Sequence, residues 1–600
     1  SATDSANTAV GAFAGDKITT GQINTAMGYL ALSKCTTGSS NVAIGYDTLG
    51  ELTTVSDNTA VGYAALQAST SGTGLAAFGK GALRANTTGN GNTAVGQNAL
   101  LSNTTGIDNV ALGANALDSN TTANDNVAIG RYALQAVTTS ADNVAVGSSA
   151  LYNNTGASNT AVGRSALLAN TTGDALVAVG ASALDANTTG VNNVAVGMNA
   201  LGANTTAANN VAVGRNALEV NTTGANNVAI GAGALDANTT ASNNTVVGKD
   251  AATANTTGDA MTAMGFGALA NNTTAANNTA VGYIAMISNT TGANNVALGA
   301  LALDANTTTS DNTSIGYASL STQNGGNGRN TALGSQALGN LTTGDSNVAV
   351  GYFAGVNTTT GTGNVFVGGG QFGVSNPAGT AVTTGNKNTL IGNAAGNAIT
   401  TGSGNTVLGG YTGNSNSLDI RTESNHVVLS SGDGTPRLVV TDNNRMMVGT
   451  TTINGAIGNF VAPNSVNTLN VFQSEGSGSH TLVAFNVSGG ATAVGSITTN
   501  SSTTAYNTTS DYRLKENVDY TWDATTRLKQ LKPARFNFIA DSTNTLVDGF
   551  LAHEVSSVVP EAITGEKDGT EMQGIDQSKL VPLLVKTIQE LEARITALES

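Results

Sequence analysis

Hydrophobic and polar positions repeat with a fixed period along the first two-thirds of the chain. Residues 209–225, NNVAVGRNALEVNTTGA, are followed directly by NNVAIGAGALDANTTAS, which has the same order of residue types. The glycine that ends the first half of each unit falls at positions 11, 28, 45, 62, 79, 96, 113, 130, 147, 163, 180, 197, 214, 231, 248, 265, 282, 299, 316, 334, 351, 368, 392 and 409. Of the 23 intervals, 20 are 17 residues long and the others are 16, 18 and 24 residues. Residues 1–409 are therefore an array of about 24 units.

Each unit predicts one short β-strand followed by a turn. The residue before the glycine is apolar, the residue two positions earlier is usually Val or Thr, and the residue between them is usually alanine, which is the alternation of a strand. The NTTG segment at the end of the unit is rich in turn-forming residues. One unit cannot bury its apolar side chains, whereas stacked units can, so we predict a mainly β protein with a β-solenoid shaft. We expect its interior to contain the residue before each glycine, such as Val213, and the leucine four residues after it, such as Leu218.

Composition and charge narrow the possible functions. Charged residues make up 10% of the chain and aromatic residues 4%, whereas about a quarter of a typical globular protein is charged. The net charge is −15 without a basic patch, so nucleic acid is not an expected partner. No apolar run reaches about 18 residues, so we expect no membrane insertion. The three histidines are far apart in sequence and no metal or nucleotide motif occurs, so neither a metal nor a cofactor is expected.

Two different regions follow the repeats. Residues 410–510 contain strand-like alternation between Gly, Asp and Asn turns, which predicts a β-rich spacer. Residues 511–600 contain 25 of the 61 charged residues and the one tryptophan, Trp522, which indicates a separate small α+β domain.

The chain ends in a heptad pattern over about residues 581–600. Apolar residues there are spaced alternately by three and four, with lysine and glutamate between them: Val581, Leu584, Ile588, Leu591, Ile595 and Leu598. This spacing is typical of a coiled coil between copies of the chain. The alternative is an amphipathic helix that packs on its own domain. We favour the coiled coil, because the seam runs to the chain end with charges outside it.

Several blocks near the C-terminus resemble a known family. In order, they are YNTTSDYRLKENV (506–518), LKQLKPARFNF, DGFLAHEVSSVVPEAI and IDQSKLVPLLVKTIQELEARI. They resemble the intramolecular chaperone domain, peptidase S74, found at the C-termini of phage tail fibres and tailspikes. The repeats resemble, less specifically, those of trimeric adhesin heads. The resemblance implies a homotrimer in which residues 511–600 template trimerisation of the shaft and then cleave themselves off. It places the cleaved bond between Ser510 and Asp511 and assigns the reaction to Ser510 and Lys515.

The chemistry of this cleavage leaves the residue roles open. A serine hydroxyl needs a base, which a desolvated lysine can supply. Attack by Ser510 on its own carbonyl, however, would close a strained four-membered ring. We therefore expect Ser510 and Lys515 to position a water molecule, or the Asp511 carboxylate to take part. By itself, SDYRLK would also fit a capped helix N-terminus, and only the flanking blocks favour self-cleavage.

Taken together, these features predict a receptor-binding tail fibre in the virion of a phage. Its expected partners are two further copies of itself and a glycan or protein on the host cell surface. The alternative is a bacterial surface trimeric adhesin, or an exported fibre with the same repeats. The lack of a signal peptide and of an anchor barrel argues against that alternative. Apart from self-cleavage, no enzyme with turnover is expected, because the repeats contain only isolated acidic residues.

Three regions are candidates for receptor binding. The spacer, 410–509, ranks first, because it becomes the fibre tip once the chaperone leaves. The 24-residue interval ranks second, because its additional residues within 369–391 must leave the shaft as a loop, which Phe372 would stiffen. Third is the position directly after the repeat glycine, which tolerates many residue types and should face solvent. Three successive units place an aromatic ring there: Tyr29, Tyr46 and Tyr63.

Overall fold

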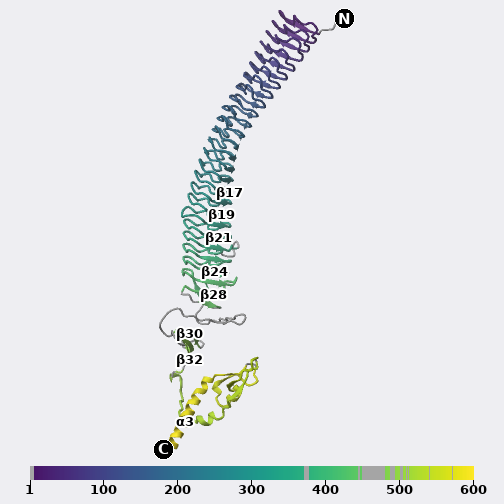
Figure 1. The fold of residues 1–600 in the computed structure, drawn as a ribbon. Helices are drawn as coiled ribbons and strands as arrows, with labels where there is room; N and C mark the ends of the chain where they lie inside the picture. Colours follow the sequence, from purple (N-terminus) through teal and green to yellow (C-terminus); the bar gives the residue numbers. More distant parts are fainter. Residues whose placement is uncertain are drawn as a thin grey trace. The chain divides into compact units, whose positions relative to one another are not determined.

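The computed structural model describes residues 6–370, 377–442, 446–448, 480–486, 493–499, 504–508, 510, 512–539, 541–569 and 572–600. The chain divides into two compact units, Ser1–Val461 and Ala462–Ser600. Figure 1 shows the fold coloured along the sequence. Each unit is described by itself below.

The first unit is a β-solenoid with one three-residue strand in each repeat, as the periodicity predicts. The strands are β1 (Thr8–Val10), β2 (Thr25–Met27), β3 (Val42–Ile44), β4 (Thr59–Val61), β5 (Ala76–Phe78), β6 (Thr93–Val95), β7 (Val110–Leu112), β8 (Val127–Ile129), β9 (Val144–Val146), β10 (Thr160–Val162), β11 (Val177–Val179), β12 (Val194–Val196), β13 (Val211–Val213), β14 (Val228–Ile230), β15 (Thr245–Val247), β16 (Thr262–Met264), β17 (Thr279–Val281), β18 (Val296–Leu298), β19 (Thr313–Ile315), β20 (Thr331–Leu333), β21 (Val348–Val350), β22 (Val365–Val367), β23 (Thr389–Ile391) and β24 (Thr406–Leu408). Neighbouring strands pair in parallel and in register, so that Val213 of β13 lies opposite Ile230 of β14. Equivalent residues of successive units therefore form columns along the stack of coils (Figure 1).

The interior of the solenoid differs from the prediction in one respect. The alanine in the middle of each strand is buried, as Ala212 is, and so is the following leucine, Leu218. Val213, before the glycine, is only partly buried, and the equivalent Leu298 is 46% exposed. The prediction that the residue before the glycine is buried is therefore wrong, whereas the prediction for the leucine is confirmed. The leucine already fills most of the narrow interior, so the strand contributes only a methyl group there and its larger side chains face outward.

Two columns of fully buried asparagines run through the coils. In the first column, which precedes the strands, the Asn227 amide N–H donates to Asn210 Oδ1 at 2.9 Å, and its side-chain Nδ2 donates to the Ala241 carbonyl at 2.8 Å. In the second, Asn221 Nδ2 donates to Asn204 Oδ1 at 3.1 Å. These bonds satisfy amide groups that would be costly to bury unpaired. The buried asparagines of the NTT triplets, such as Asn204 and Asn221, thus stabilise the stack and are too deeply buried to carry a glycan.

The repeat glycine is required by a close approach between coils. Gly214 has a φ of +137°, and a Cβ placed on it would lie 2.4 Å from the carbonyl oxygen of Gly231 in the next coil. The chain also turns through left-handed residues that are not glycine, including Asn216 and Leu218, with φ of 60° and 53°. Such residues cost free energy in isolation. Here the contacts between coils hold them in place.

Near the end of the array, compensating substitutions keep the interior volume nearly constant. Phe366 replaces the strand alanine of β22 and is fully buried. Gly355 and Gly379 stand where most units have leucine, and a Cβ on either would lie 2.4 Å from an atom of the Phe366 ring. The same exchange recurs with Leu390 and Gly396, where a Cβ would meet the leucine side chain at 2.7 Å. A larger strand residue thus requires a smaller turn residue.

The last coils are closed by a small antiparallel cap. A hairpin of β25 (Asn414–Ser415) and β26 (Leu418–Asp419) precedes β27 (Val427–Ser430), which pairs in parallel with β24. The strands β28 (Pro436–Val440) and β29 (Met446–Val448) then continue the sheet in antiparallel orientation.

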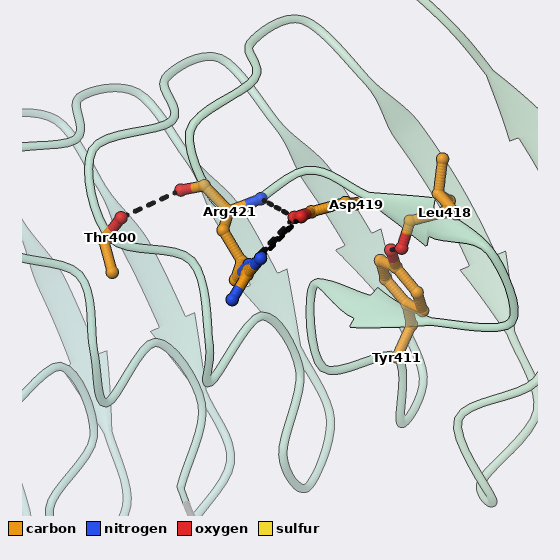
Figure 2. A network of polar contacts seen from close by, with 5 residues as sticks. All are labelled: Thr400, Tyr411, Leu418, Asp419 and Arg421. Atoms are coloured by element: carbon orange, nitrogen blue, oxygen red, sulfur yellow. Dashed lines mark hydrogen bonds and ion pairs between the residues drawn. The ribbon is translucent and has the colours of Figure 1, made fainter.

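Figure 2 shows the polar contacts that hold this cap. The buried Tyr411 hydroxyl donates to the Leu418 carbonyl at 2.8 Å, and burial raises the pKa of this phenol. The Arg421 guanidinium donates to both carboxylate oxygens of Asp419, which lowers the pKa of Asp419. Thr400 Oγ1 donates to the Arg421 carbonyl at 3.2 Å. These contacts tie the hairpin to the last regular coils.

The described part of the second unit contains a three-stranded antiparallel sheet followed by a small α+β region. The sheet contains β30 (His480–Asn486), β31 (Ala493–Thr499) and β32 (Thr504–Thr508). The later elements are η1 (Tyr512–Leu514), α1 (Ala524–Leu528), β33 (Ala534–Phe536), β34 (Val547–Gly549), α2 (Ala552–Val555), η2 (Pro560–Ala562), β35 (Ile563–Thr564), β36 (Gly574–Ile575), η3 (Gln577–Leu580) and α3 (Val581–Glu599). A small core of Ala524, Val555, Val559 and Leu583, with Trp522 against it, joins α1, α2 and α3.

Candidate functional site

The structure brings Ser510 and Lys515 together. The short helix η1 ends at Leu514, and the Lys515 backbone N–H donates to the Tyr512 carbonyl at 3.1 Å. This turn directs the lysine side chain back along the chain, and Nζ donates to Ser510 Oγ at 2.7 Å. Both side chains are exposed. Asp511 lies outside the described residues, so no geometry is assigned to it.

This contact shows one hydrogen bond of a serine–lysine pair, in which the lysine is the donor. The ammonium group donates a hydrogen bond to the Ser510 hydroxyl. In this protonation state the lysine cannot accept a proton from serine or water. A lysine acts as a base when water is removed from around it. The two side chains are within hydrogen-bond distance of each other, in an exposed position.

The C-terminal helix α3 uses one face to hold its own domain. Leu583 and Thr587 are buried on this face. One turn later, the Glu590 carboxylate accepts from the backbone N–H groups of Ala524 and Thr525 at 2.9 and 2.7 Å. It thereby caps the N-terminus of α1, and the Thr525 hydroxyl and these amides lower the pKa of Glu590. The packing of α3 on its own domain thus does not use the heptad seam.

The heptad seam lies on the other face of α3 and is exposed. Its six residues are between 44% and 87% exposed: Val581, Leu584, Ile588, Leu591, Ile595 and Leu598. A hollow of about 460 Å³ adjoins the start of this seam and is lined by Trp522, Val581, Pro582 and Val585, among others. Burial of aliphatic side chains normally stabilises a helix of this kind, so the exposed seam is a candidate interaction surface.

A second apolar surface runs along the solenoid. We call it the aliphatic strip, meaning the first and third residues of the strands β2 to β24; the third residue is apolar in every strand, whereas the first is threonine in 11 of the 23 strands. Many of these residues are more than a third exposed, including Leu112, Ile230, Leu298 and Leu408 at 39–49%. With 23 coils about 4.8 Å apart, the strip is roughly 110 Å long. Contiguous apolar surfaces of that size are uncommon on a soluble monomer and mark interaction sites.

The three tyrosines at the position after the repeat glycine form a stacked row. The ring centroids of Tyr29 and Tyr46 are 5.4 Å apart, and those of Tyr46 and Tyr63 are 5.1 Å apart. The side chains are 45–53% exposed. Phe13 covers the other side of Tyr29 edge-on, at 5.9 Å. Most ring faces in this row are therefore covered by neighbouring rings. Phe372, the other aromatic candidate, lies outside the described residues.

Sequence reasoning missed a second aromatic row in the same column. Phe266 and Tyr283 stack at 5.7 Å, and Lys249 Nζ lies 5.3 Å from the Phe266 ring centroid. Reading the residue after every repeat glycine, rather than only the first clear run, would have found it.

Two other kinds of site are absent from the described residues. No group of three or more histidine, cysteine, aspartate or glutamate side chains there could hold a metal ion. No helix in that part of the chain is both long enough and apolar enough to cross a membrane.

Comparison with protein families gives one match, at the C-terminal region. Residues 510–564 match the model of the Peptidase S74 family, described as the chaperone of endosialidase. The match begins at Ser510 and includes Lys515, and it covers a small part of the chain. Comparison with curated proteins and with solved structures yields no match. The C-terminal region thus resembles an intramolecular chaperone attached to a β-solenoid fibre.

Proposed function

We propose that the chain is a receptor-binding tail fibre of a phage, assembled as a homotrimer by a C-terminal chaperone that then cleaves itself off. The observation that carries the proposal is the chaperone-family match, which begins at Ser510, the residue that Lys515 contacts. Fibre-like repeats upstream of such a domain are what a chaperone of this kind would assemble.

The aliphatic strip supports a trimer of shafts. In a single chain its branched side chains remain partly exposed over the length of the array. Packing three strips around a common axis would remove this apolar area from water, at about 25 cal/mol for each Å² buried. The charged residues are sparse along the strands, so little electrostatic repulsion opposes this packing. The neighbour that fits the strip best is therefore a second copy of the same strip.

The chaperone has a physical reason to act first. Successive coils of the solenoid are almost identical, so three shafts displaced by one unit would still match apolar residues with apolar residues. A trimer formed through the α3 seam would bring the three chains together at one end and fix their alignment. The shafts could then associate from that end with the correct register.

Cleavage fits the same sequence of events. In the single chain, Ser510 and Lys515 are exposed, and Lys515 Nζ donates a hydrogen bond to Ser510 Oγ. Assembly of three chaperones would cover the pair and favour the neutral amine, which can accept a proton from the attacking water. Loss of the chaperone would then make disassembly slow, which is kinetic stability.

For receptor binding we propose the order of candidates expected from the sequence. The spacer 410–509 would be the tip after cleavage, and part of it lies outside the described residues. The insertion within 369–391 is the second candidate and the row of Tyr29, Tyr46 and Tyr63 the third. Exchanging the spacer for that of another fibre should abolish binding of the cleaved trimer to host cells. Retained binding after this exchange, with loss on deleting the insertion, would reverse the order.

Assembly and cleavage can be separated with seam variants. We expect Leu591→Asp in the full chain to prevent both trimer formation and cleavage, because it places a charge at the centre of the seam. Ala593→Asp is the matched control, since Ala593 is exposed on α3 outside the seam. Ser510→Ala should form a trimer that stays uncut. Light scattering and denaturing gels read the two events, and a cleaved Leu591→Asp monomer would refute the proposed order.

A further inference from the structure

The residues directly after the repeat glycines form a column along the solenoid. Around Gly299, aromatic and small residues alternate in this column. Tyr283, Ala300 and Tyr317 occupy this position in three successive units. Their order in space is fixed by backbone hydrogen bonds, because the Leu301 N–H donates to the Tyr283 carbonyl at 3.1 Å and the Ala318 N–H donates to the Ala300 carbonyl at 3.0 Å. Tyr283 and Tyr317 are 57% and 52% exposed. Two exposed rings are thus separated by one unit with only a methyl group.

The ring of Tyr283 packs against another aromatic side chain on one of its faces. Phe266 stacks on Tyr283 with an interplanar angle of 15° and a centroid distance of 5.7 Å. Lys249 covers the far side of Phe266, with Nζ 5.3 Å from the ring centroid. A side chain fixed in this way loses little conformational entropy when it binds a ligand. The face of Tyr283 toward Ala300 is the one that Phe266 leaves uncovered.

The spacing suits a single ring between the two tyrosines. Parallel strands repeat about every 4.8 Å, so Tyr283 and Tyr317 start roughly 9.6 Å apart along the column. A ring midway between them would lie about 4.8 Å from each, within the ~4.5–7 Å range at which rings pack favourably. At the first tyrosine row the equivalent space is already filled, since Tyr46 stands between Tyr29 and Tyr63 at 5.4 and 5.1 Å.

We propose that Tyr283 and Tyr317 bind one pyranose ring of a carbohydrate between them, above Ala300. A pyranose has two apolar C–H faces, one for each tyrosine ring of the column, and equatorial hydroxyls, which would remain in water or reach the tyrosine hydroxyls. A flat aromatic ligand would fit between the two tyrosines but would not use their hydroxyl groups. The inference rests on the proposed receptor-binding function and names a carbohydrate class and a site for it.

Saturation-transfer NMR on the full-length protein tests the site directly. The probes are methyl β-D-glucopyranoside, methyl β-D-galactopyranoside and methyl α-D-mannopyranoside, with glycerol as a polyol that lacks ring faces. We expect saturation of the C–H protons on the ring faces of at least one glycoside. Tyr283→Ala and Tyr317→Ala should each weaken the apparent affinity by roughly threefold to tenfold.

The most discriminating variant fills the space between Tyr283 and Tyr317 instead of removing one of the two rings. Ala300→Tyr should create a continuous row like that of the first tyrosines, which the fold already accommodates, and should abolish the glycoside signal. Ala114→Tyr is the matched control, because it makes the same change in this column between Gln97 and Arg131. It should leave the signal unchanged.

The outcomes separate this site from the proposed function. Absence of a signal for all three glycosides, or a signal that survives Ala300→Tyr, would overturn the site even if the cleaved trimer binds host cells. A signal lost in Ala300→Tyr and retained in Ala114→Tyr supports the site, whether or not the fibre binds cells. Failure of the wild-type trimer to bind cells would contradict the receptor-binding function alone.

Discussion

Replacing one repeat glycine tests the close stacking of coils most sharply. In Gly214→Ala, the new methyl carbon would lie 2.4 Å from the Gly231 carbonyl oxygen, 2.5 Å from its carbon and 2.9 Å from the Ala232 nitrogen. All three atoms belong to the backbone of the next coil, so no side chain can rotate away. The φ of +137° is also a conformation that residues with a Cβ rarely adopt.

The size of the effect follows from these two problems. Backbone strain at such a φ costs about 1–3 kcal/mol. Moving the coils apart would also weaken local hydrogen bonds, including that from the Gly231 N–H to the Val213 carbonyl at 2.7 Å. Each such bond contributes about 0.5–1.5 kcal/mol. Together these terms predict a local destabilisation of about 3–5 kcal/mol.

Hydrogen exchange read by mass spectrometry is the suitable assay, because a solenoid can open locally without unfolding as a whole. Amides of residues 211–235 should exchange about 100-fold faster or more in Gly214→Ala, while distant coils remain protected. The control is Gly202→Ala, because a Cβ there meets nothing closer than 3.3 Å and the next units have Glu219 and Asp236 at this position. Equal protection in the two variants would refute the argument.

Two further predictions concern the interior and the pH dependence of the shaft. Phe366→Ala should destabilise the surrounding coils by about 3–5 kcal/mol, and adding Gly379→Leu, which restores the usual alanine–leucine pair, should recover much of this loss in hydrogen exchange. No recovery would contradict the volume compensation. Burial, together with the charges of Glu219 and Asp250, raises the pKa of Asp236 in the folded state. Protonation of this carboxyl therefore favours the folded state, and the stabilisation is lost as the pH rises through the pKa of the folded state. Asp236→Asn should therefore increase the protection of the local coils from hydrogen exchange at pH 7 but not at pH 3. The control is Asp125→Asn, because Asp125 is exposed. Increased protection that persists at pH 3, or an equal increase in the control, would count against this cause.

The sequence predicted the architecture of the shaft but not which face of each strand is buried. Periodicity requires one strand in each unit, and β1 to β24 fall on the repeated block. Alternation alone defines two faces without saying which is buried. The larger side chains around Ala212 suggested the wrong face, because the volume of Leu218 and the buried asparagine columns is visible only once the coil is closed.

The candidate site shows a similar limit. The spacing of Ser510 and Lys515 along the chain does not by itself bring them together, and only the resemblance of the flanking blocks suggested it. The turn at Tyr512–Leu514 supplies the physical reason, since it returns the lysine amine to within 2.7 Å of the serine hydroxyl. The heptad seam was readable from spacing, whereas the role of Glu590 as a cap for α1 depends on a contact between residues 65 positions apart.

The central claim is that a trimerising chaperone assembles the shaft and then leaves it. Native mass spectrometry of freshly expressed wild-type protein, with denaturing mass spectrometry of the same sample, tests it most directly. The account predicts a trimer of chains that end at Ser510, a separate fragment that begins at Asp511, and an uncut trimer for Ser510→Ala. A wild-type sample containing only intact, monomeric chains of 600 residues would contradict it.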